Sequence, residues 1–318
     1  MSAAPSRIRP AEPRDLAAVV DLLNACDVVE TGCPDTTTQD VENDWSLEGF
    51  DVSRDAWVAV ADDGRITGYA YTGDQLGASE PEADFWIDPE HDESGLAERL
   101  LNLAERRTRE LARARSYGDD ATLSIFCITV DRAKRELLQR RGFRLVRTAY
   151  RLAAELRAPT GPPSPPAGVE IRPFRAGEDE SVMYATLMDA CSHHHRRGNP
   201  PFEAWRTKLL GHGDFDPGLW FLAWDGDQAV GGLMAYDHGD IGWVTGLGVS
   251  RPWRRQGIGG ALLARAFVEL ARRGQRRVEL GVEAETPALA VYERAGMRVT
   301  FSYESYMKHL VGPGVSSP

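Results

Sequence analysis

The stretch GLGVSRPWRRQGIGG, residues 246–260, decides the fold of this 318-residue chain. An apolar segment at 243–249 predicts a strand, a proline then turns the chain, and glycines open an amphipathic helix that we expect at 257–273. Glycines let backbone N–H groups approach an anion closely, and the start of a helix adds the positive end of its dipole. Arg254 and Arg255 can add charge-assisted hydrogen bonds. The stretch therefore predicts a pyrophosphate-binding loop; the alternative is a solvated basic helix with a glycine-rich start.

The segments around this loop predict a mixed α/β sheet. An antiparallel pair of strands followed by strand–helix–strand–helix order is typical of a sheet that contains both antiparallel and parallel strands. The predicted elements are a helix at 178–192, strands at 219–224, 229–236 and 243–249, a helix at 257–273, a strand at 277–283, and a helix that Thr286 caps, Pro287 opens and Gly296 ends.

The chain contains two copies of this unit, joined by a proline-rich linker. Residues 8–10 (Ile-Arg-Pro) return at 171–173, and the strand-like segment 57–64 returns in the same order at 220–226. Between the copies lies a segment with five prolines, which favour extended backbone and a semi-rigid spacer. The predicted boundaries are 1–156 for the first domain, 157–168 for the linker and 169–318 for the second domain.

Two motifs of the second copy resemble those of a known family. Val249 followed by RRQGIG at 254–259 resembles the acyl-CoA-binding motif of the GNAT superfamily of N-acyltransferases, Gln/Arg-x-x-Gly-x-Gly/Ala. The segment ALAVYERAGM at 288–297 resembles the downstream segment of that family, in which a glycine follows a tyrosine by four residues. The resemblance implies an α/β fold of two tandem GNAT domains, with acetyl-CoA as the co-substrate of an N-acetyltransferase.

The resemblance also implies roles for individual residues of the second copy. The backbone of Leu247, Gly248 and Val249 would bind the pantetheine arm. Tyr292 would protonate the departing CoA thiolate, a role that suits a phenol with a pKa of about 10. The pyrophosphate would be held by Arg254, Arg255, Gln256, Gly257, Ile258, Gly259 and Gly260. Glu285 departs from the family, which usually has an asparagine there, so that contact is not carried over.

The first copy keeps the spacing of the cofactor loop but reverses its charge. Ile87 precedes Gly95 by the same spacing as Val249 precedes Gly257. Carboxylates occupy this loop, and a leucine takes the place of the tyrosine; the residues are Asp88, Glu90, Asp92, Glu93 and Leu138. Like charges a few Å apart cost on the order of 1–4 kcal/mol, so acetyl-CoA is not expected to bind there. We predict that the first copy is a degenerate GNAT domain with a structural role and a role in shaping the acceptor cleft.

The acceptor is expected to be the primary amine of a small molecule that attacks the thioester directly. An amine with a pKa near 10.4 must first lose a proton, at a cost of about 4.6 kcal/mol at pH 7, so a base is expected. Glu283, near the end of a predicted strand, is the predicted base, with Asp237 and Asp240 as alternatives. His194, in a run of three histidines, and Trp243 are the predicted substrate-binding residues.

The identity of the acceptor stays open between two kinds of amine. The tandem layout with the intact copy second resembles mycothiol synthases, which makes a cysteinyl-glycoside precursor an alternative to an antibiotic-like or biosynthetic amine. Those enzymes have a substrate-binding glutamate six residues before the valine of the cofactor strand, whereas this chain has Trp243. A non-catalytic acyl-CoA-binding sensor or scaffold is the alternative of another class; the intact tyrosine favours catalysis.

Composition argues against several classes of partner. The net charge of −11 disfavours nucleic acid and suits a cationic small molecule. No apolar run reaches about 18 residues and the start lacks an apolar signal segment, so we expect a cytoplasmic monomer or homodimer without a membrane partner. The cysteines are too scattered for a disulfide scaffold or a zinc knuckle, so we expect reduced thiols and no metal site. They are Cys26, Cys33, Cys127 and Cys191.

Overall fold

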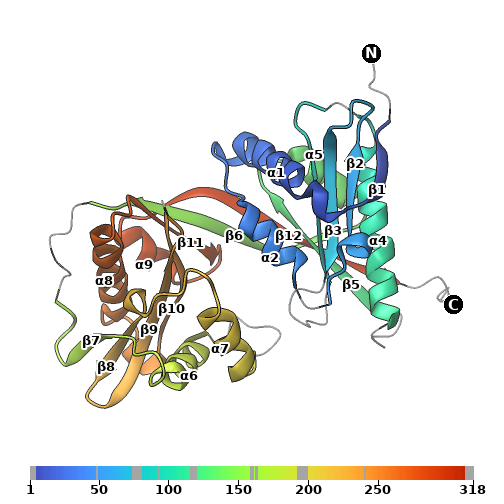
Figure 1. Cartoon of the computed structure of the whole chain (residues 1–318). Coiled ribbons are helices and arrows are strands. Elements are labelled where there is room, and N and C mark those ends of the chain that lie inside the picture. Colours follow the sequence, from blue (N-terminus) through green and yellow to red (C-terminus); the bar gives the residue numbers. More distant parts are fainter. Residues whose placement is uncertain are drawn as a thin grey trace. The chain divides into compact units, whose positions relative to one another are not determined.

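The chain forms two compact units, shown in Figure 1. Unit 1 comprises residues 1–148 and 301–318, and unit 2 comprises residues 149–300. None of the described helices is long and apolar enough to cross a lipid bilayer. The computed structural model describes residues 5–47, 49–73, 81–91, 93–114, 120–157, 161, 164–191, 200–239 and 241–311.

Unit 2 is built on a mixed sheet with the strand order β6-β11-β10-β9-β8-β7. The central strand β10 pairs antiparallel with β9 and parallel with β11, so the predicted mixed sheet is confirmed. The elements of unit 2 are β6 (Arg144–Glu155, from Ala149 onward), β7 (Val169–Pro173), α6 (Glu180–Cys191), α7 (Phe202–Leu210), β8 (Phe221–Asp225), β9 (Gln228–Asp237), β10 (Ile241–Val249), α8 (Ile258–Arg272), β11 (Arg277–Glu283) and α9 (Leu289–Arg294).

Helices α6 and α8 cover opposite faces of this sheet. A Cβ on Gly232 would lie 2.7 Å from the Met183 sulfur of α6, whereas a Cβ on the adjacent Gly231 would lie 3.2 Å from Leu262 of α8. Because side chains alternate along a strand, these two neighbours identify the two faces. The face toward α6 is called the α6 face below. Buried apolar side chains fill both layers, among them the fully buried Trp220.

Unit 1 repeats this architecture, as the sequence repeats predict. Its strand order is β1-β2-β3-β4-β5-β12, with β4 and β5 parallel, and α4 follows β4 as α8 follows β10. The elements of unit 1 are β1 (Arg7–Pro10), α1 (Leu16–Thr31), α2 (Thr38–Trp45), α3 (Val52–Asp55), β2 (Ala56–Val60), β3 (Ile66–Gly73), β4 (Glu82–Ile87), α4 (Leu96–Ala114), β5 (Asp120–Ile128), α5 (Arg132–Arg140) and β12 (Arg298–Val311, from Phe301 onward).

The two sequence copies exchange their last strands. Residues 149–155 of β6 pair antiparallel with β11 of unit 2, and residues 303–311 of β12 pair antiparallel with β5 of unit 1. The compact units therefore differ from the segments 1–156 and 169–318 by one strand each. Local patterns predict that a segment forms a strand, but they do not say which of two similar sheets it joins.

Most element boundaries predicted for unit 2 lie within two residues of those in the structure, and the strand predicted at 277–283 coincides with β11. The exception is α9, which begins at Leu289 rather than directly after Thr286. The Thr286 hydroxyl accepts the Ala288 N–H at 3.3 Å and so caps a turn that precedes the helix. Gly296, with a φ of 90°, follows α9 as predicted.

Candidate functional site

Strands β10 and β11 separate halfway along their length and open a wedge in the sheet of unit 2. They pair in parallel only over residues 241–243 of β10 and 277–279 of β11. Beyond this pairing, β10 continues to Val249 and β11 to Glu283. A bulge after Val244 shifts the register of β10 close to the point of separation. The second half of β10 therefore has one edge without a neighbouring strand.

This unpaired edge carries the residues predicted to bind the pantetheine arm, Leu247, Gly248 and Val249. Their other edge is paired with β9, so the backbone groups that point into the wedge are left for a ligand. An extended chain with amide groups can bind such an edge as an added strand would. Gly248 is also needed for packing, because a Cβ there would lie 2.6 Å from the Cβ of Ala190 on α6.

The loop between β10 and α8 forms an open cradle at the start of the helix. Gly257 is the N-cap with a φ of 87°, in the left-handed region that favours glycine. The first helical bond runs from the Ala261 N–H to the Gly257 carbonyl, so the N–H groups of 258–260 have no helical acceptor. A Cβ on Gly260 would meet nothing within 4 Å, and one on Gly259 only ordinary contacts at 3.7 Å. Packing does not require these two glycines, and the room they leave suits an anion at the helix start.

The side chains of the loop have different surroundings. Arg254 donates to the Val249 carbonyl at 2.9 Å and to the Ala190 carbonyl at 2.8 Å, so its guanidinium ties the loop to the ends of β10 and α6. Gln256 likewise donates to a carbonyl of its own loop at 3.2 Å. Arg255 is exposed, and its φ of 62° makes it the one described non-glycine residue with a positive φ. Both arginines are exposed, and Arg254 is the one held by these two backbone carbonyls.

Tyr292, the predicted acid, is buried on α9 beside the cradle. A Cβ on Gly259 would lie 3.7 Å from both Val249 of β10 and Val291 of α9. Helix α9 therefore packs where β10 ends and α8 begins. The Tyr292 side chain is 7% exposed and belongs to the core of unit 2. This placement is compatible with the predicted role of Tyr292, which stays a prediction.

Trp243, predicted to contact the substrate, lies on the α6 face. It is paired with Tyr236 of β9, which shares the face of Gly232 because the two are four residues apart. The Tyr236 hydroxyl donates to the Leu209 carbonyl of α7 at 3.1 Å. Burial raises the pKa of Tyr236 well above its ordinary value, so this phenol stays protonated at neutral pH.

Charged side chains lie beside Trp243 at the apex of the wedge. Glu279 is 4% exposed and forms ion pairs with Arg151 of β6 and with Arg277 of β11, the latter at 2.5 Å. The guanidinium of Arg151 lies 4.8 Å from the centre of the Trp243 ring. Glu283, the predicted base, alternates onto the same face as Glu279, nearer to the open end of the wedge. The structure thus brings Trp243 and Glu283 to one face.

Two residues at this face, Arg151 and Glu279, were not predicted from the sequence. Arg151 belongs to the first sequence copy and reaches the site only because β6 joins the sheet of unit 2. Glu279 stands in a strand whose alternate residues are apolar, and its carboxylate in a buried strand is the signal that could have identified it.

The structure does not place three other predicted residues at this site. His194 and Asp240 lie outside the described residues. Asp237, an alternative base, accepts the Gly239 N–H at 3.0 Å and a hydrogen bond from Gln275. It therefore stabilises the hairpin between β9 and β10, at the end of the sheet away from the cradle.

In unit 1 the counterpart of the cofactor loop is occupied by the chain's own side chains. The Glu93 carboxylate is buried and accepts hydrogen bonds from the Ser6 N–H at 2.9 Å and from Arg99 at 2.5 Å, with His91 3.2 Å away. Although burial opposes ionisation, the hydrogen bonds from Ser6 help to lower the pKa of Glu93. The Glu93 carboxylate is thus paired inside the loop, the failure of acetyl-CoA to bind there stays a prediction, and Asp92 lies outside the described residues.

Unit 1 keeps a wedge of its own, with a different lining. Strands β4 and β5 pair in parallel only over residues 82–83 and 124–125, and a cavity of about 610 Å³ lies at the end of β4 between α1 and α5. Glu98, in the first turn of α4, lines this cavity and takes the place of Gly260 in unit 2. Glu30 lines it as well, and burial raises the pKa of Glu30 to about 7. The cavity is thus lined by both carboxylates and cations, with Glu98 paired to Arg140 at 3.7 Å, and it has a carboxylate where the cradle of unit 2 has a glycine.

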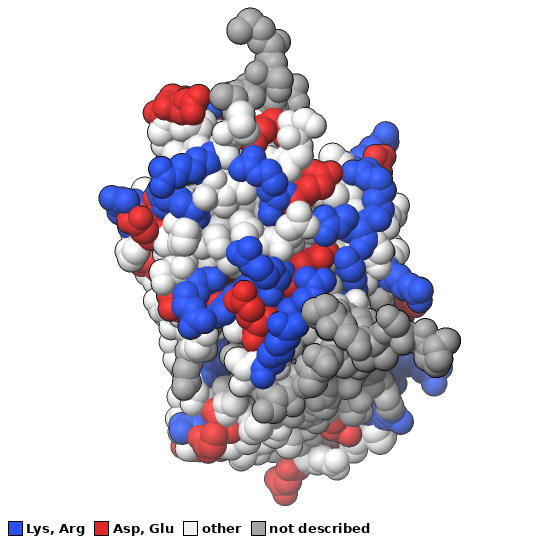
Figure 2. Space-filling model, turned by 90° about the vertical axis from the view of Figure 1, so that its right-hand side faces the viewer, with Lys and Arg blue, Asp and Glu red and all other residues white. Residues whose placement is uncertain are grey.

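Basic side chains are numerous on the face of unit 1 that Figure 2 turns toward the viewer, with acidic side chains between them. Within unit 1, Arg107 of α4 binds Asp55 at 2.6 Å and Glu110 at 3.0 Å, and Lys308 binds Glu105 at 2.8 Å. These two cations are therefore paired with carboxylates of the same unit.

A pair of diverging parallel strands, a glycine-rich loop at a helix start and a buried tyrosine beside that loop define the site of an acyl-CoA-dependent transferase. Residues 182–297 match the model of the acetyltransferase (GNAT) family. The chain is also similar to mycothiol acetyltransferase of Geodermatophilus obscurus, with 32% identity over 93% of this chain and 96% of the relative. The mycothiol acetyltransferase of Catenulispora acidiphila is 28% identical over 76% of this chain and 78% of the relative.

Solved structures give the same result. A GCN5-related N-acetyltransferase from Sphaerobacter thermophilus has a TM-score of 0.84 and 29% identity, covering 100% of this chain and 99% of that chain. A tandem GNAT protein from the clavulanic acid biosynthesis pathway has a TM-score of 0.72 at 16% identity, covering 97% and 99%, and shows the shared fold. The chain belongs to the GNAT N-acetyltransferases and carries two GNAT domains in tandem.

Proposed function

We propose that unit 2 transfers the acetyl group of acetyl-CoA to the primary amine of a cysteinyl glycoside of the mycothiol type. The observation that carries this proposal is the wedge between β10 and β11. It places an unpaired strand edge, a glycine-rich helix start and a face with carboxylates next to one another. The relatives named mycothiol acetyltransferase support the choice of acceptor.

The cofactor is held mainly by backbone groups. The β10 edge from Leu247 to Val249 binds the amides of the pantetheine arm, and the N–H groups of residues 258–260 bind the pyrophosphate. The Ile258 side chain is 1% exposed, so it anchors the helix start in the core while its N–H faces the cradle. Arg255 adds a charge at the rim, and Arg254 fixes the shape of the loop through its two carbonyl contacts.

The reaction is a direct transfer within the wedge. The neutral amine attacks the thioester carbonyl carbon, so that a C–N bond forms as the C–S bond breaks. The proton that the amine loses goes to Glu283, directly or through water, and Tyr292 donates a proton to the CoA thiolate. A phenol with a pKa of about 10 is a matched donor to a thiolate with a pKa of about 8.5.

The charges on the α6 face support an amine acceptor. Glu279 is paired with two arginines, whereas Glu283 is nearer to the opening and is the carboxylate that an incoming ammonium group would meet. A second candidate, another small primary amine, is favoured by Trp243, which stands where mycothiol synthases are expected to have a glutamate. The Arg151 guanidinium lies 4.8 Å from the centre of its ring, so this position presents an aromatic ring and a cation in place of a carboxylate.

Mass spectrometry of products from a panel of amines tests the proposal. The panel contains the cysteinyl glycoside, the same glycoside without cysteine, an aminoglycoside and lysine, each with acetyl-CoA. We expect N-acetylation of the cysteinyl glycoside with a kcat/KM at least tenfold above the others. A higher value for an aminoglycoside would replace the acceptor while leaving the reaction class intact, whereas no turnover with any amine would contradict the proposal.

The base is tested separately by Glu283→Gln. This variant should lower kcat at neutral pH by about 10²-fold. It should regain part of the rate as the pH approaches the pKa of the amine, where the amine is neutral without the help of a base. A pH profile identical to that of the wild type would assign the base elsewhere.

We further propose that unit 1 does not bind acetyl-CoA and that the enzyme works in the cytoplasm as a monomer or homodimer. The free thiols of Cys26, Cys33 and Cys127 support a reducing compartment. The carboxylates of the unit 1 cavity support the loss of cofactor binding.

A further inference from the structure

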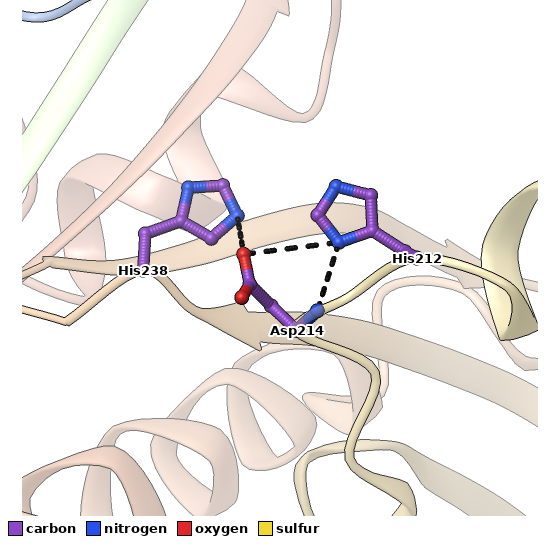
Figure 3. Close-up of side chains that lie close together, drawn as sticks. All are labelled: His212, Asp214 and His238. Carbon is purple, nitrogen blue, oxygen red and sulfur yellow. Dashed lines mark hydrogen bonds and ion pairs between the residues drawn. The ribbon is translucent and has the colours of Figure 1, made fainter. Parts of the chain in front are cut away.

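Two histidines and an aspartate converge on the surface of unit 2, away from the cofactor cradle. His212 and Asp214 lie in the loop that follows α7, and His238 follows the last residue of β9. The Asp214 carboxylate lies 3.6 Å from His238 Nε2 and 3.8 Å from His212 Nδ1. In Figure 3 both imidazole rings direct a nitrogen toward this carboxylate. One donor atom from each residue lies within 4.8 Å of the other two.

We propose that His212, Asp214 and His238 form a binding site for a divalent transition-metal ion of the Zn²⁺ type. Imidazole nitrogen and carboxylate oxygen are the donors that Zn²⁺ takes at about 2.0–2.2 Å, and three protein ligands leave one position for water. Ligands at that distance in tetrahedral geometry are about 3.4 Å apart. The three side chains are 40–44% exposed, so small rotations close the remaining gap without disturbing the core.

Both loops that carry the donors are held in place by buried neighbours. The Phe215 N–H donates to the His212 carbonyl, and the Phe215 ring packs edge-on against Trp220 with centroids 5.1 Å apart. On the other side, Gln275 donates to the Gly239 carbonyl at 2.6 Å and so fixes the turn after His238. The donors therefore project from two anchored turns, which lowers the entropy cost of bringing them onto one ion.

The imidazoles are also oriented before any ion binds. The Asp214 N–H donates to His212 Nδ1 at 3.2 Å, so this nitrogen carries a lone pair, which an ion takes when this surface hydrogen bond opens. The His212 ring stacks on Tyr236 with centroids 4.6 Å apart, and the His238 ring lies nearly parallel to it at an angle of 11°. Two imidazole nitrogens and one carboxylate oxygen are a donor set that suits a divalent transition-metal ion.

An ion at this site links the loop after α7 to the end of β9. Tyr236, whose ring stacks with both imidazole rings, is paired with Trp243 of β10. The ion would thus stabilise the part of unit 2 that supports the acceptor pocket, without touching the reacting atoms. This inference does not depend on the identity of the acceptor.

The test is a calorimetric titration of the full-length, tag-free, chelator-treated protein with ZnSO₄. We expect one Zn²⁺ per chain in the micromolar range, and at least tenfold weaker binding in each of His212→Ala, Asp214→Asn and His238→Ala. Zn²⁺ should raise the melting temperature of the wild type and leave that of His238→Ala unchanged. Because all three side chains are on the surface, the variants should melt like the wild type when no metal is present.

The matched control removes the other histidine cluster of the chain. A variant with alanine substitutions at His193, His194 and His195 should bind Zn²⁺ as the wild type does. Loss of binding in that variant, retention of binding in His212→Ala combined with His238→Ala, or no binding by the wild type would each overturn the proposal.

Discussion

The loop before α4 in unit 1 and the loop before α8 in unit 2 have a similar backbone conformation, but they differ in the side chains that they present to an anion. Gly95 and Gly257 have φ values of 84° and 87°, and each precedes a helix at the end of a parallel strand. In unit 2 the next turn contains Gly259 and Gly260, which leave open space. In unit 1 the first turn contains Glu98, and the preceding Glu93 is bound by Ser6 and Arg99. The fold thus provides a helix N-terminus in both units, whereas a few side chains determine whether an anion can bind there.

The largest effect is expected from cutting the chain at the predicted linker. A fragment of residues 169–318 lacks β6, whose residues 149–155 pair with β11, and with it the fully buried Leu152. The fragment keeps β12, which can take the place of β6 beside β11 but lacks the Leu152 side chain, so unit 2 should melt well below the full chain. Thermal unfolding followed by circular dichroism checks this, and a fragment that melts like the full chain would show that unit 2 does not need the exchanged strand.

The second prediction concerns Gly260, which is replaced by the type of residue that unit 1 has at the equivalent position. Gly260→Glu places a carboxylate where Glu98 stands in unit 1, and because a Cβ at Gly260 meets nothing within 4 Å the fold should persist. Repulsion between this carboxylate and the pyrophosphate should weaken acetyl-CoA binding by about 10²-fold or more. Gly260→Gln is the matched control, since it adds the same bulk without the charge. Equal affinities of the two variants in calorimetry would show that charge does not distinguish the two loops.

The third prediction concerns the tyrosine that unit 1 lacks. Tyr292→Phe removes only the hydroxyl from a side chain buried in the core, so acetyl-CoA affinity and the melting temperature should be kept. Loss of the proton donor should lower kcat by about 10²–10⁴-fold, measured with the preferred amine under saturating acetyl-CoA. An unchanged kcat would make Tyr292 a packing residue like its counterpart Leu138.

The smallest effect is expected in the cavity of unit 1. Burial raises the pKa of Glu30 from 4.5 to about 7, so the folded state holds this proton more tightly than the unfolded state. Stability should therefore fall as the pH rises from about 4.5 to about 7, and Glu30→Gln should remove this loss. Allowing for solvent screening, the variant should be more stable than the wild type by about 1 kcal/mol at pH 8 and by less at pH 5. Urea unfolding at the two pH values checks this, and an equal difference at both would contradict the assignment.

Much of unit 2 could be predicted because each signal was local. The glycine-rich loop, the amphipathic helix α8 and the apolar alternation of β11 lie within single segments, and their predicted positions agree with the structure. The two exchanged strands could not be predicted, because either copy of the sheet offers a similar edge to either strand. For the same reason Arg151, which is far from the site in sequence, was missed.

Individual side chains in the loops were harder to predict than the loops themselves. Arg254 was predicted to bind phosphate, which stays a prediction, and the sequence did not indicate that its guanidinium also donates to two backbone carbonyls. Glu93 was predicted to repel phosphate, but it is turned inward and hydrogen-bonded. Residue type and spacing predict that charge lies near a loop, whereas the direction of each side chain depends on partners from distant segments.

The stoichiometry of acetyl-CoA binding tests the central claim most directly. Calorimetric titration of the full-length protein with acetyl-CoA should give one site per chain, and Gly260→Glu should abolish that site without revealing a second. Two sites per chain in the wild type would show that unit 1 binds the cofactor, and either that result or one site of unchanged affinity in Gly260→Glu would contradict the account.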